Sequence, residues 1–356
     1  MPKLIIFVDA LPFELKDDFL GIFDSLNFVT KLQPELGYSS NQHMALFAGK
    51  LPKDIGYLGD YSLDRENKVF KSILTHNNPI NYIYRKLEAK ITSNNANIPL
   101  GMKDVFINNG YYPLASKDNL TKVNIKYDKY DFKLPCINKE IEFLQNLIEE
   151  SEKIEPYTFI CLNSIDHIGH IKGTASKYYK RHLNKLLHKV NQLIKNFITK
   201  YGESDIILLS DHGMSNSPKK VSINLESQFG PQSNNTYVYF VDSSVLKVWC
   251  ADSALKSKIK NYLASLEYGV CLDDEQLDHY GVDSNIADLV FVVKSNFFIE
   301  PQYFGFGLKS KVMGMHGALP TCSDQFGILL SNFNTGSCTL RNSKVFTEVL
   351  EKREFV

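Results

Sequence analysis

Three apolar runs in the chain are each followed, at once or within a few residues, by an acidic residue. LIIFV precedes Asp9, TFICL leads through three residues to Asp166, and DIILLS precedes Asp211. A continuous apolar run of this length predicts a strand buried on both faces, as in a parallel sheet. In open α/β sheets the ligand crevice lies outside the carboxyl ends of such strands. We therefore expect the three acids to meet at one edge of a sheet.

The clearest helix is expected from about residue 176 to residue 201. Its apolar positions repeat every 3.6 residues, Lys and Arg occupy the opposite face, and Gly202 follows its end. The strand–helix–strand order around it predicts an α/β fold, with a mostly parallel central sheet flanked by helices and right-handed crossovers. A last strand is expected at FGILLS, residues 326–331.

After Ser215 the pattern changes to shorter elements. YVYFVDSS, VLKVWC and LVFVVK predict strands, and DSALKSKIKNYLASL predicts a helix. We interpret residues 236–310 as a small inserted α+β cap, with residues 1–235 and 311–356 forming the core. We expect this cap to govern selectivity and to be dispensable for metal binding. Residues 60–135 show no periodicity that predicts an element.

Composition limits the classes of partner. The 356 residues include 40 basic and 40 acidic side chains, so no net charge attracts the chain to nucleic acid or an anionic membrane. The six cysteines are dispersed without a CxxC pair, which favours free thiols over disulfides. The sequence shows no secretory signal and no apolar run long enough to span a membrane. We expect a cytoplasmic protein that acts on a small molecule, with neither a nucleic-acid polymer nor a membrane as partner; its oligomeric state stays open.

Histidines accompany the acids at spacings typical of metal ligands. Asp166-x-x-x-His170 places two donors on one face of a helical turn, and adjacent Asp211 and His212 could bind two different ions. His316 lies between glycines that permit close backbone approach. Each placement alone has a simpler explanation, such as a helix-capping Asp or a surface His. Oxygen and imidazole donors together suit zinc or manganese better than calcium.

A candidate nucleophile lies in GYSSNQH, residues 37–43. A serine at a loop-to-helix junction exposes its hydroxyl at the helix N-terminus. There the backbone N–H groups and the helix dipole favour the binding of a phosphate group. A metal ion would lower the pKa of the hydroxyl and replace a general base. The alternative is that Ser39 or Ser40 merely caps the helix.

Taken together, these residues resemble the alkaline phosphatase superfamily, and within it the type I phosphodiesterase/nucleotide pyrophosphatase family. That family has a strand-end Asp, a Thr or Ser nucleophile about ten residues before T-G-x-x-P-x-x-x-G, a D-x-x-G-H pair, D-H-G and G-x-H-G. Here the glycine stretch is AGKLPKDIG, residues 48–56, which places Ser39 at the nucleophile position. The resemblance extends from residue 3 to about residue 331.

The resemblance implies two divalent metal ions, zinc first and manganese as an alternative. The ion that activates the nucleophile would be held by Asp9, Ser39, Asp211 and His212. The ion that activates water would be held by Asp166, His170 and His316. The implied enzyme is a metal-dependent phosphoric ester hydrolase, a phosphodiesterase or nucleotide pyrophosphatase with a covalent intermediate on Ser39.

Two departures and several alternatives remain. The nucleophile is Ser rather than the commoner Thr, and Asp60 replaces an Asn that contacts phosphate in many of these enzymes, which makes Asp60 a candidate substrate-binding residue. A phosphomonoesterase, phosphonate hydrolase or sulfatase of the same superfamily is the alternative. The formylglycine signature C/S-x-P-x-R of sulfatases is absent at Ser39. A non-catalytic binding protein would require a lost ligand, whereas all seven positions carry a competent residue.

Overall fold

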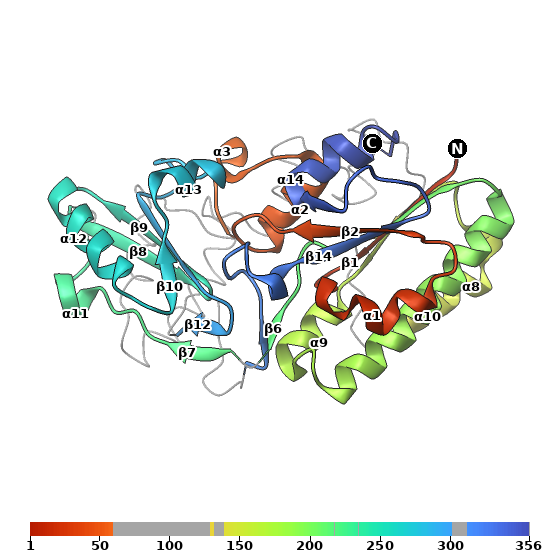
Figure 1. Ribbon diagram of the computed structural model, residues 1–356, viewed down its shortest axis with the longest axis horizontal. Helices are drawn as coiled ribbons and strands as arrows, with labels where there is room; N and C mark the ends of the chain where they lie inside the picture. Colours follow the sequence, from red (N-terminus) through yellow and green to blue (C-terminus); the bar gives the residue numbers. More distant parts are fainter. Residues whose placement is uncertain (60–128, 132–138, 217, 234, 301–311, 356) are drawn as a thin grey trace, which may run out of the picture.

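The computed structural model describes residues 1–59, 129–131, 139–216, 218–233, 235–300 and 312–355 (Figure 1). These residues form a central seven-stranded sheet. Its strands, in spatial order, are β15 (Thr339–Arg341), β2 (Phe28–Gln33), β14 (Gly327–Ser331), β5 (Asp205–Leu209), β1 (Lys3–Val8), β4 (Tyr157–Leu162) and β3 (Lys129–Asp131). Only β14, the predicted FGILLS strand, runs antiparallel to its neighbours within this sheet. The prediction of a mostly parallel central sheet is confirmed.

Strand β1 shows why the sheet lies at the centre of the molecule. Leu4, Ile6 and Val8 belong to the apolar cluster on one face, and Ile5 and Phe7 to the cluster on the other. Successive side chains of a strand point to opposite faces, so both faces of β1 are covered. The continuous apolar run is therefore explained by helices packed on both sides.

The helices divide between these two faces (Figure 1). One face carries α1 (Lys16–Phe19), α8 (Glu140–Glu149), α9 (Ser164–Lys172) and α10 (Lys177–Tyr201). The other carries α2 (Ser39–Ala48), α3 (Pro52–Ile55), α14 (Asn342–Val345) and the π-helical turn Phe346–Leu350. Short 3-10 turns occur at Phe13–Leu15, Leu20–Ile22, Ser151–Lys153 and Ser323–Gln325. The predicted long helix is α10: the Ser176 hydroxyl accepts a hydrogen bond from the backbone N–H of Tyr179 at 3.1 Å, and Gly202 ends the helix.

A second, antiparallel sheet lies beside the first (Figure 1, left). Its strands, in spatial order, are β10 (Gly269–Cys271), β11 (Leu289–Val293), β9 (Val245–Cys250) and β8 (Tyr237–Asp242). Helices α11 (Glu226–Phe229), α12 (Ser253–Ala264) and α13 (Asp274–His279) accompany it. We call residues 237–293 the inserted sheet. Two short pairs, β7 (Lys219–Val221) with β12 (Phe297–Ile299) and β6 (Ser215–Asn216) with β13 (Gly314–Met315), connect the chain before and after it.

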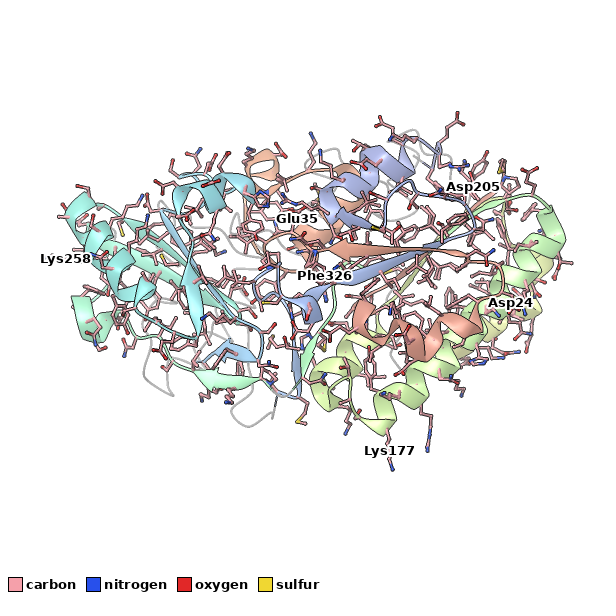
Figure 2. The ribbon with its side chains drawn as sticks, viewed as in Figure 1. Asp24, Glu35, Lys177, Asp205, Lys258 and Phe326 are labelled. Atoms are coloured by element: carbon pink, nitrogen blue, oxygen red, sulfur yellow. The ribbon has the colours of Figure 1, made fainter. Side chains whose placement is uncertain are left out.

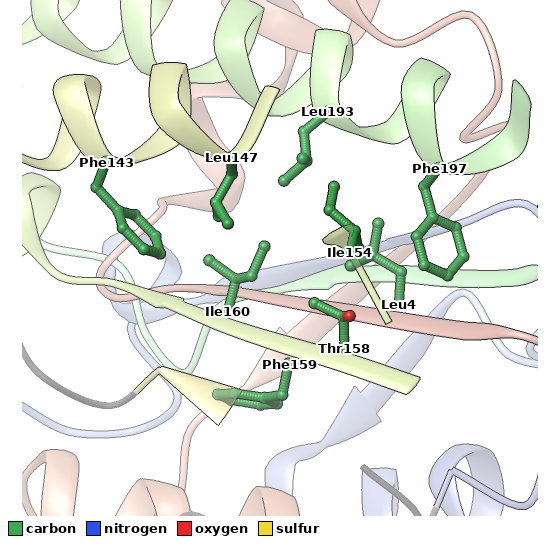
Figure 3. A pocket seen from close by; sticks show the side chains of 9 residues that line it. All are labelled: Leu4, Phe143, Leu147, Ile154, Thr158, Phe159, Ile160, Leu193 and Phe197. Atoms are coloured by element: carbon green, nitrogen blue, oxygen red, sulfur yellow. The ribbon is translucent and has the colours of Figure 1, made fainter. Parts of the chain in front are cut away.

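Away from the edges of the central sheet, the molecule has charged side chains at its surface and a small cavity in its core. Lys258 on α12 projects outward at the left of the molecule and Lys177 on α10 at its lower edge (Figure 2). A small apolar cavity lies between α8, α10 and strands β1 and β4, and Thr158 is the polar residue among its lining side chains (Figure 3). This cavity is part of the core and contains none of the predicted site residues.

Two further expectations concern helices and thiols. Among the described residues, no helix is long and apolar enough to cross a membrane. Among the described cysteines Cys161 is buried and Cys338 is exposed, and Cys250, Cys271, Cys322 and Cys338 form no disulfide.

Candidate functional site

The carboxyl ends of three adjacent parallel strands bring three aspartates together. β1 pairs with β4 on one side and with β5 on the other, both in parallel. Asp9 follows β1 directly, Asp166 lies in the first turn of the helix after β4, and Asp211 follows β5 by one residue. Asp9 and Asp211 are buried. The structure thus places the three acids at one edge of the sheet.

Helix α9 brings His170 to Asp166. The two residues lie one turn apart, with His170 Nε2 3.2 Å from Asp166 Oδ1. The other ring nitrogen, Nδ1, lies 2.9 Å from the carbonyl oxygen of Gly314. A backbone acceptor at Nδ1 orients the imidazole and leaves Nε2 facing the carboxylates.

The N-terminus of α9 is held by an acid that the sequence interpretation did not single out. Glu140, the first residue of α8, is 1% exposed and accepts hydrogen bonds from the backbone N–H groups of Asn163 at 2.6 Å and Ser164 at 3.0 Å. These are N–H groups that the helix cannot satisfy itself. Burial raises the pKa of Glu140, while these hydrogen bonds act in the opposite direction. Its carboxyl group therefore fixes the helix that carries Asp166.

His212 and His316 meet above the three acids although 104 residues separate them (316 − 212). Pairing of β6 with β13 brings the two segments together, and the rings stack with centroids 3.8 Å apart. His212 Nε2 lies 3.6 Å from Asp9 Oδ1 and 3.4 Å from Asp211 Oδ2. His316 Nε2 lies 3.5 Å from Asp166 Oδ1. The two histidines therefore link the acids of all three strands.

Ser39 is the first residue of α2 and faces the same group. Its hydroxyl oxygen lies 3.5 Å from His212 Nε2, and its side chain is half-buried. The neighbouring Ser40 is 6% exposed. α2 follows β2, which is aligned with β1 and β5, so its N-terminus lies at the same edge of the sheet.

Two sets of these donors are close enough to share an ion. Asp9, Asp211 and His212 form one cluster, and Asp166, His212 and His316 form the other. Within each cluster the candidate ligand atoms lie within 4.8 Å of one another. His212 belongs to both clusters, so the boundary between the sets is less sharp than the resemblance implied.

The protonation of the carboxylates differs with their surroundings. Burial, and then the negative charges of Asp211 and Asp166, raise the pKa of Asp9 well above its usual value. Burial also favours the neutral acid at Asp166 and Asp211, but neighbouring imidazoles outweigh it. His170 and His212 respectively contribute most to holding the pKa of these two acids below the usual range.

The imidazoles are also shifted in opposite directions. Burial and the neighbouring His212 lower the pKa of His316 well below its usual value, so this ring is neutral and ready to act as a ligand. At His170 burial acts in the same direction, but the charge of Asp166 outweighs it and raises the pKa.

The donor set fits divalent metal ions. Three buried carboxylate oxygens accept no hydrogen bond from any described residue, namely Asp9 Oδ1, Asp166 Oδ1 and Asp211 Oδ2. Buried polar atoms without partners are rare and call for an explanation. All three oxygens face imidazole nitrogens, and an ion between them would satisfy both kinds of atom. Mixed carboxylate and imidazole donors are those that zinc and similar ions prefer.

Two further histidines lie next to the candidate ligands. His43, which the sequence interpretation did not assign a role, is 1% exposed and lies with Nε2 3.5 Å from Asp211 Oδ2. The sequence did contain one signal for this position, because His43 follows Ser39 by four residues and residues at this spacing share one face of a helix. His167 is exposed beside Asp166. Asp60 lies outside the described residues, so its predicted contact with substrate stays a prediction.

Comparison with known proteins agrees with this geometry. The sequence profile of the type I phosphodiesterase/nucleotide pyrophosphatase family matches residues 37–317. The chain belongs to this family. It is therefore a metal-dependent phosphoric ester hydrolase, and the family resemblance inferred from the motifs is confirmed. A comparison with curated protein sequences gives no match.

Solved structures show the same fold at low sequence identity. Murine ectonucleotide pyrophosphatase/phosphodiesterase 5 superposes with a TM-score of 0.64 at 13% identity, covering 100% of this chain and 96% of that one. An inactive form of the murine protein in complex with AMP gives 0.62 at 14% identity, covering 99% and 94%. Phosphonoacetate hydrolase from Sinorhizobium meliloti 1021, in complex with phosphonoformate, gives 0.61 at 13% identity, covering 97% and 94%. The chain thus shares its fold with these structures.

Proposed function

We propose that this chain hydrolyses a phosphodiester or pyrophosphate bond in a small molecule, with Ser39 as the covalent nucleophile. The observation that carries this proposal is the position of the Ser39 hydroxyl. It lies 3.5 Å from Nε2 of His212, the residue shared by both ligand clusters. A phosphoryl group in contact with this hydroxyl would therefore lie beside both sets of donors.

The residues divide between two ions in this proposal. Asp9, Ser39, Asp211 and His212 would hold one, and Asp166, His170 and His316 would hold the other. When bound, such ions lower the pKa of a coordinated hydroxyl or water and stabilise the negative charge that develops on the attacking and leaving oxygens. We propose zinc, with manganese as the alternative, because imidazole and carboxylate donors contribute in equal number, three of each.

The side chains and backbone supply orientation and charge. The Ser39 hydroxyl gives up its proton to solvent as Oγ forms a bond to phosphorus, in line with the leaving group. The bond between phosphorus and the leaving-group oxygen breaks, and that oxygen takes up a proton from solvent. Water then attacks the phosphoryl- or nucleotidyl-Ser39 and releases the serine. The N-terminus of α2, at which Ser39 stands, favours the negative charge on the non-bridging oxygens. The contribution of the protein is thus mainly positioning and electrostatic stabilisation.

A hydrolysis panel tests the proposal. Purified protein treated with chelator and then supplied with Zn2+ or Mn2+ is assayed with bis-p-nitrophenyl phosphate, p-nitrophenyl phosphate, p-nitrophenyl sulfate, nucleotide sugars and phosphonoacetate. We expect metal-dependent turnover with the diester and with one or more pyrophosphate substrates. Preference for the monoester, sulfate or phosphonate would assign the chain to the alternative activity. No metal-dependent turnover on any of them would refute the proposal.

We further propose that the protein acts in the cytoplasm on a small molecule. Support comes from Cys250, Cys271, Cys322 and Cys338, which form no disulfide, as is typical of a reducing compartment. The ligands in two similar structures, AMP and phosphonoformate, are small molecules. Cell fractionation with an antibody to the untagged chain would test the location.

A further inference from the structure

The turn between β8 and β9 extends from the inserted sheet to the candidate site. Ser243 in this turn has a positive φ of 47°, and Ser244 is fully buried. Backbone hydrogen bonds fix the turn from two sides: Ile299 N–H donates to the Ser243 carbonyl at 2.7 Å, and Val293 N–H donates to the Ser244 carbonyl at 3.0 Å. The turn is therefore a buried, well-anchored part of the inserted sheet.

Tyr38 connects this turn to the proposed nucleophile. Its hydroxyl donates a hydrogen bond to the carbonyl of Asp242 and accepts one from the backbone N–H of Ser244 at 2.5 Å. Its own carbonyl accepts the backbone N–H groups of Asn41 at 2.9 Å and Gln42 at 3.0 Å at the start of α2. Tyr38 immediately precedes Ser39 in the chain. The residue before the nucleophile is thus held at its side chain by the inserted sheet and at its backbone by α2.

Ser244 connects the same turn to the other side of the site. Its hydroxyl donates a hydrogen bond to the carbonyl of His316 at 2.7 Å. The rings of Tyr38 and His316 meet edge to face with centroids 5.7 Å apart. Gly317 follows with φ of +79°, and a Cβ there would lie 3.0 Å from Tyr38 Cε1, so only glycine fits this backbone against the ring.

Apolar packing joins the inserted sheet to the same segments. Three residues near the candidate site belong to the hydrophobic cluster of the inserted sheet. They are Leu36, two residues before Tyr38; Leu58, in the loop after α3; and Ala318, two residues after His316. Lys247 on β9 is 1% exposed, and its ammonium donates a hydrogen bond to the carbonyl of Leu58 at 2.5 Å. Removing residues of the inserted sheet would expose all of these groups. These contacts argue against the expectation that this part of the chain is dispensable for metal binding.

We propose that Tyr38 and Ser244 are positioning residues for the reaction and that the β8–β9 turn aligns the two halves of the site with each other. Through the Tyr38 hydroxyl the turn fixes the backbone that presents Ser39. Through the Ser244 hydroxyl it fixes the backbone that presents His316. This inference rests on the proposed function, in which Ser39 attacks phosphorus and His316 holds an ion.

Removing the Tyr38 hydroxyl tests the first half. Tyr38→Phe should lower kcat by about 10-fold to 100-fold, because small misplacements of a nucleophile have effects of this size. KM and the number of bound ions should stay unchanged. Tyr237→Phe is the matched control, since the buried Tyr237 on β8 donates a hydrogen bond to the Gly230 carbonyl at 2.6 Å in the same sheet, where no proposed site residue takes part. This control should keep the wild-type kcat.

Removing the Ser244 hydroxyl tests the second half. Ser244→Ala should weaken the binding of one of the two ions by about 10-fold, as loss of a group that orients a metal ligand does. Saturating metal should restore most of the turnover. Ser331→Ala is the matched control, because Ser331 on β14 is equally buried and donates to the carbonyl of Phe333 at the same distance of 2.7 Å. Ion binding is measured by competition with a chromogenic chelator, and thermal unfolding is recorded for all four variants.

The outcomes separate the two proposals. If Tyr38→Phe and Ser244→Ala differ from their controls only in thermal stability, the residues are merely structural and the inference is overturned. If wild-type protein shows no metal-dependent turnover, the proposed function fails. In that case the difference in ion affinity between Ser244→Ala and Ser331→Ala still decides whether the turn positions His316.

Discussion

His43 Nε2 lies 3.5 Å from Oδ2 of Asp211, beneath the candidate metal site. The imidazole is 1% exposed and packs edge-on against Phe7 of β1, with ring centroids 4.7 Å apart. Because His43 follows Ser39 by four residues on α2, one helix presents the proposed nucleophile and also contacts a carboxylate of the ion that would activate it. Metal ligands depend on such neighbours for their orientation.

Replacing His43 should therefore weaken metal binding. In His43→Phe a ring still fills the space beside Phe7, but Asp211 Oδ2 loses one neighbouring imidazole and keeps His212 Nε2 at 3.4 Å. We expect the affinity for one ion to fall by about 10-fold to 100-fold, as for other residues that orient a ligand. Chelator competition measures the change. His188→Phe, at an exposed position of α10, provides the control, and equal affinities for the two variants would contradict the prediction.

Replacing Ser39 and replacing Ser40 should have different effects on turnover. Ser39→Ala should abolish turnover, whereas the loss of a hydroxyl at a helix start changes the free energy of unfolding by at most about 2 kcal/mol. Ser40→Ala should retain turnover, because the Ser40 side chain is buried, belongs to neither ligand cluster, and its hydroxyl has no hydrogen-bond partner among the described residues. Turnover and thermal unfolding of both variants give the answer. An active Ser39→Ala with an inactive Ser40→Ala would move the nucleophile by one position.

Metal binding should release protons, and the apparent affinity should rise with pH. The pKa of Asp9 is raised by burial and by its acidic neighbours, and the pKa of His170 is raised by Asp166. Both groups hold a proton to higher pH than usual in the metal-free protein, yet both must lose it to bind an ion. Affinity should therefore increase until the pH passes both values.

Calorimetry in two buffers of different ionisation enthalpy measures the protons released. Asp9→Asn is the informative variant, because an amide carries no proton to lose, and it should release fewer protons than the wild type. An equal release from both proteins would show that Asp9 is already ionised before the metal binds.

The contact of Asp60 with substrate remains a prediction, and two kinds of contact can be distinguished by experiment. The two residues before it are held in place, because the Gly59 N–H donates to Asn41 Oδ1 at 2.6 Å and the Leu58 carbonyl accepts from the Lys247 ammonium. An ionised carboxylate about 4 Å from a phosphate oxygen would cost roughly 4 kcal/mol at an effective dielectric constant of about 20. If Asp60 faces the phosphate, Asp60→Asn should raise turnover of simple diesters.

If Asp60 instead accepts a hydrogen bond from a hydroxyl or amine of the substrate, the same change should lower turnover of that substrate alone. Kinetics with bis-p-nitrophenyl phosphate and with the best substrate of the hydrolysis panel separate the two. No change with either substrate would place Asp60 outside the site.

The sequence predicted those elements whose apolar residues follow a regular pattern. Strands β1, β4 and β5 and helix α10 carry unmistakable apolar patterns, and the acids that follow the strands lie where parallel strands must end. Strand β2 was missed, because Thr30, Lys31 and Gln33 interrupt its apolar residues. The antiparallel direction of β14 was also not predicted, since an apolar run has no direction.

The residues that support the site were harder to find than the ligands. Glu140 reads as an ordinary acid in the first turn of a helix, and His43 as a core histidine. Their roles depend on which helix packs beside them, and local sequence contains no such information. The contacts of Tyr38 and Ser244 are of the same kind, because 206 residues separate the two (244 − 38).

The stacked rings of His212 and His316 join parts of the chain that are far apart in sequence. An ion held by one cluster would tie residue 9 to residue 211, and an ion held by the other would tie residue 166 to residue 316. Each ion would thus close a loop of well over a hundred residues, and links of that length restrict the unfolded chain most strongly. The ligand atoms that take part in the reaction would then also act, through the bound ions, as reversible cross-links. The concentration of available metal would therefore control the stability of the folded protein as well as its activity.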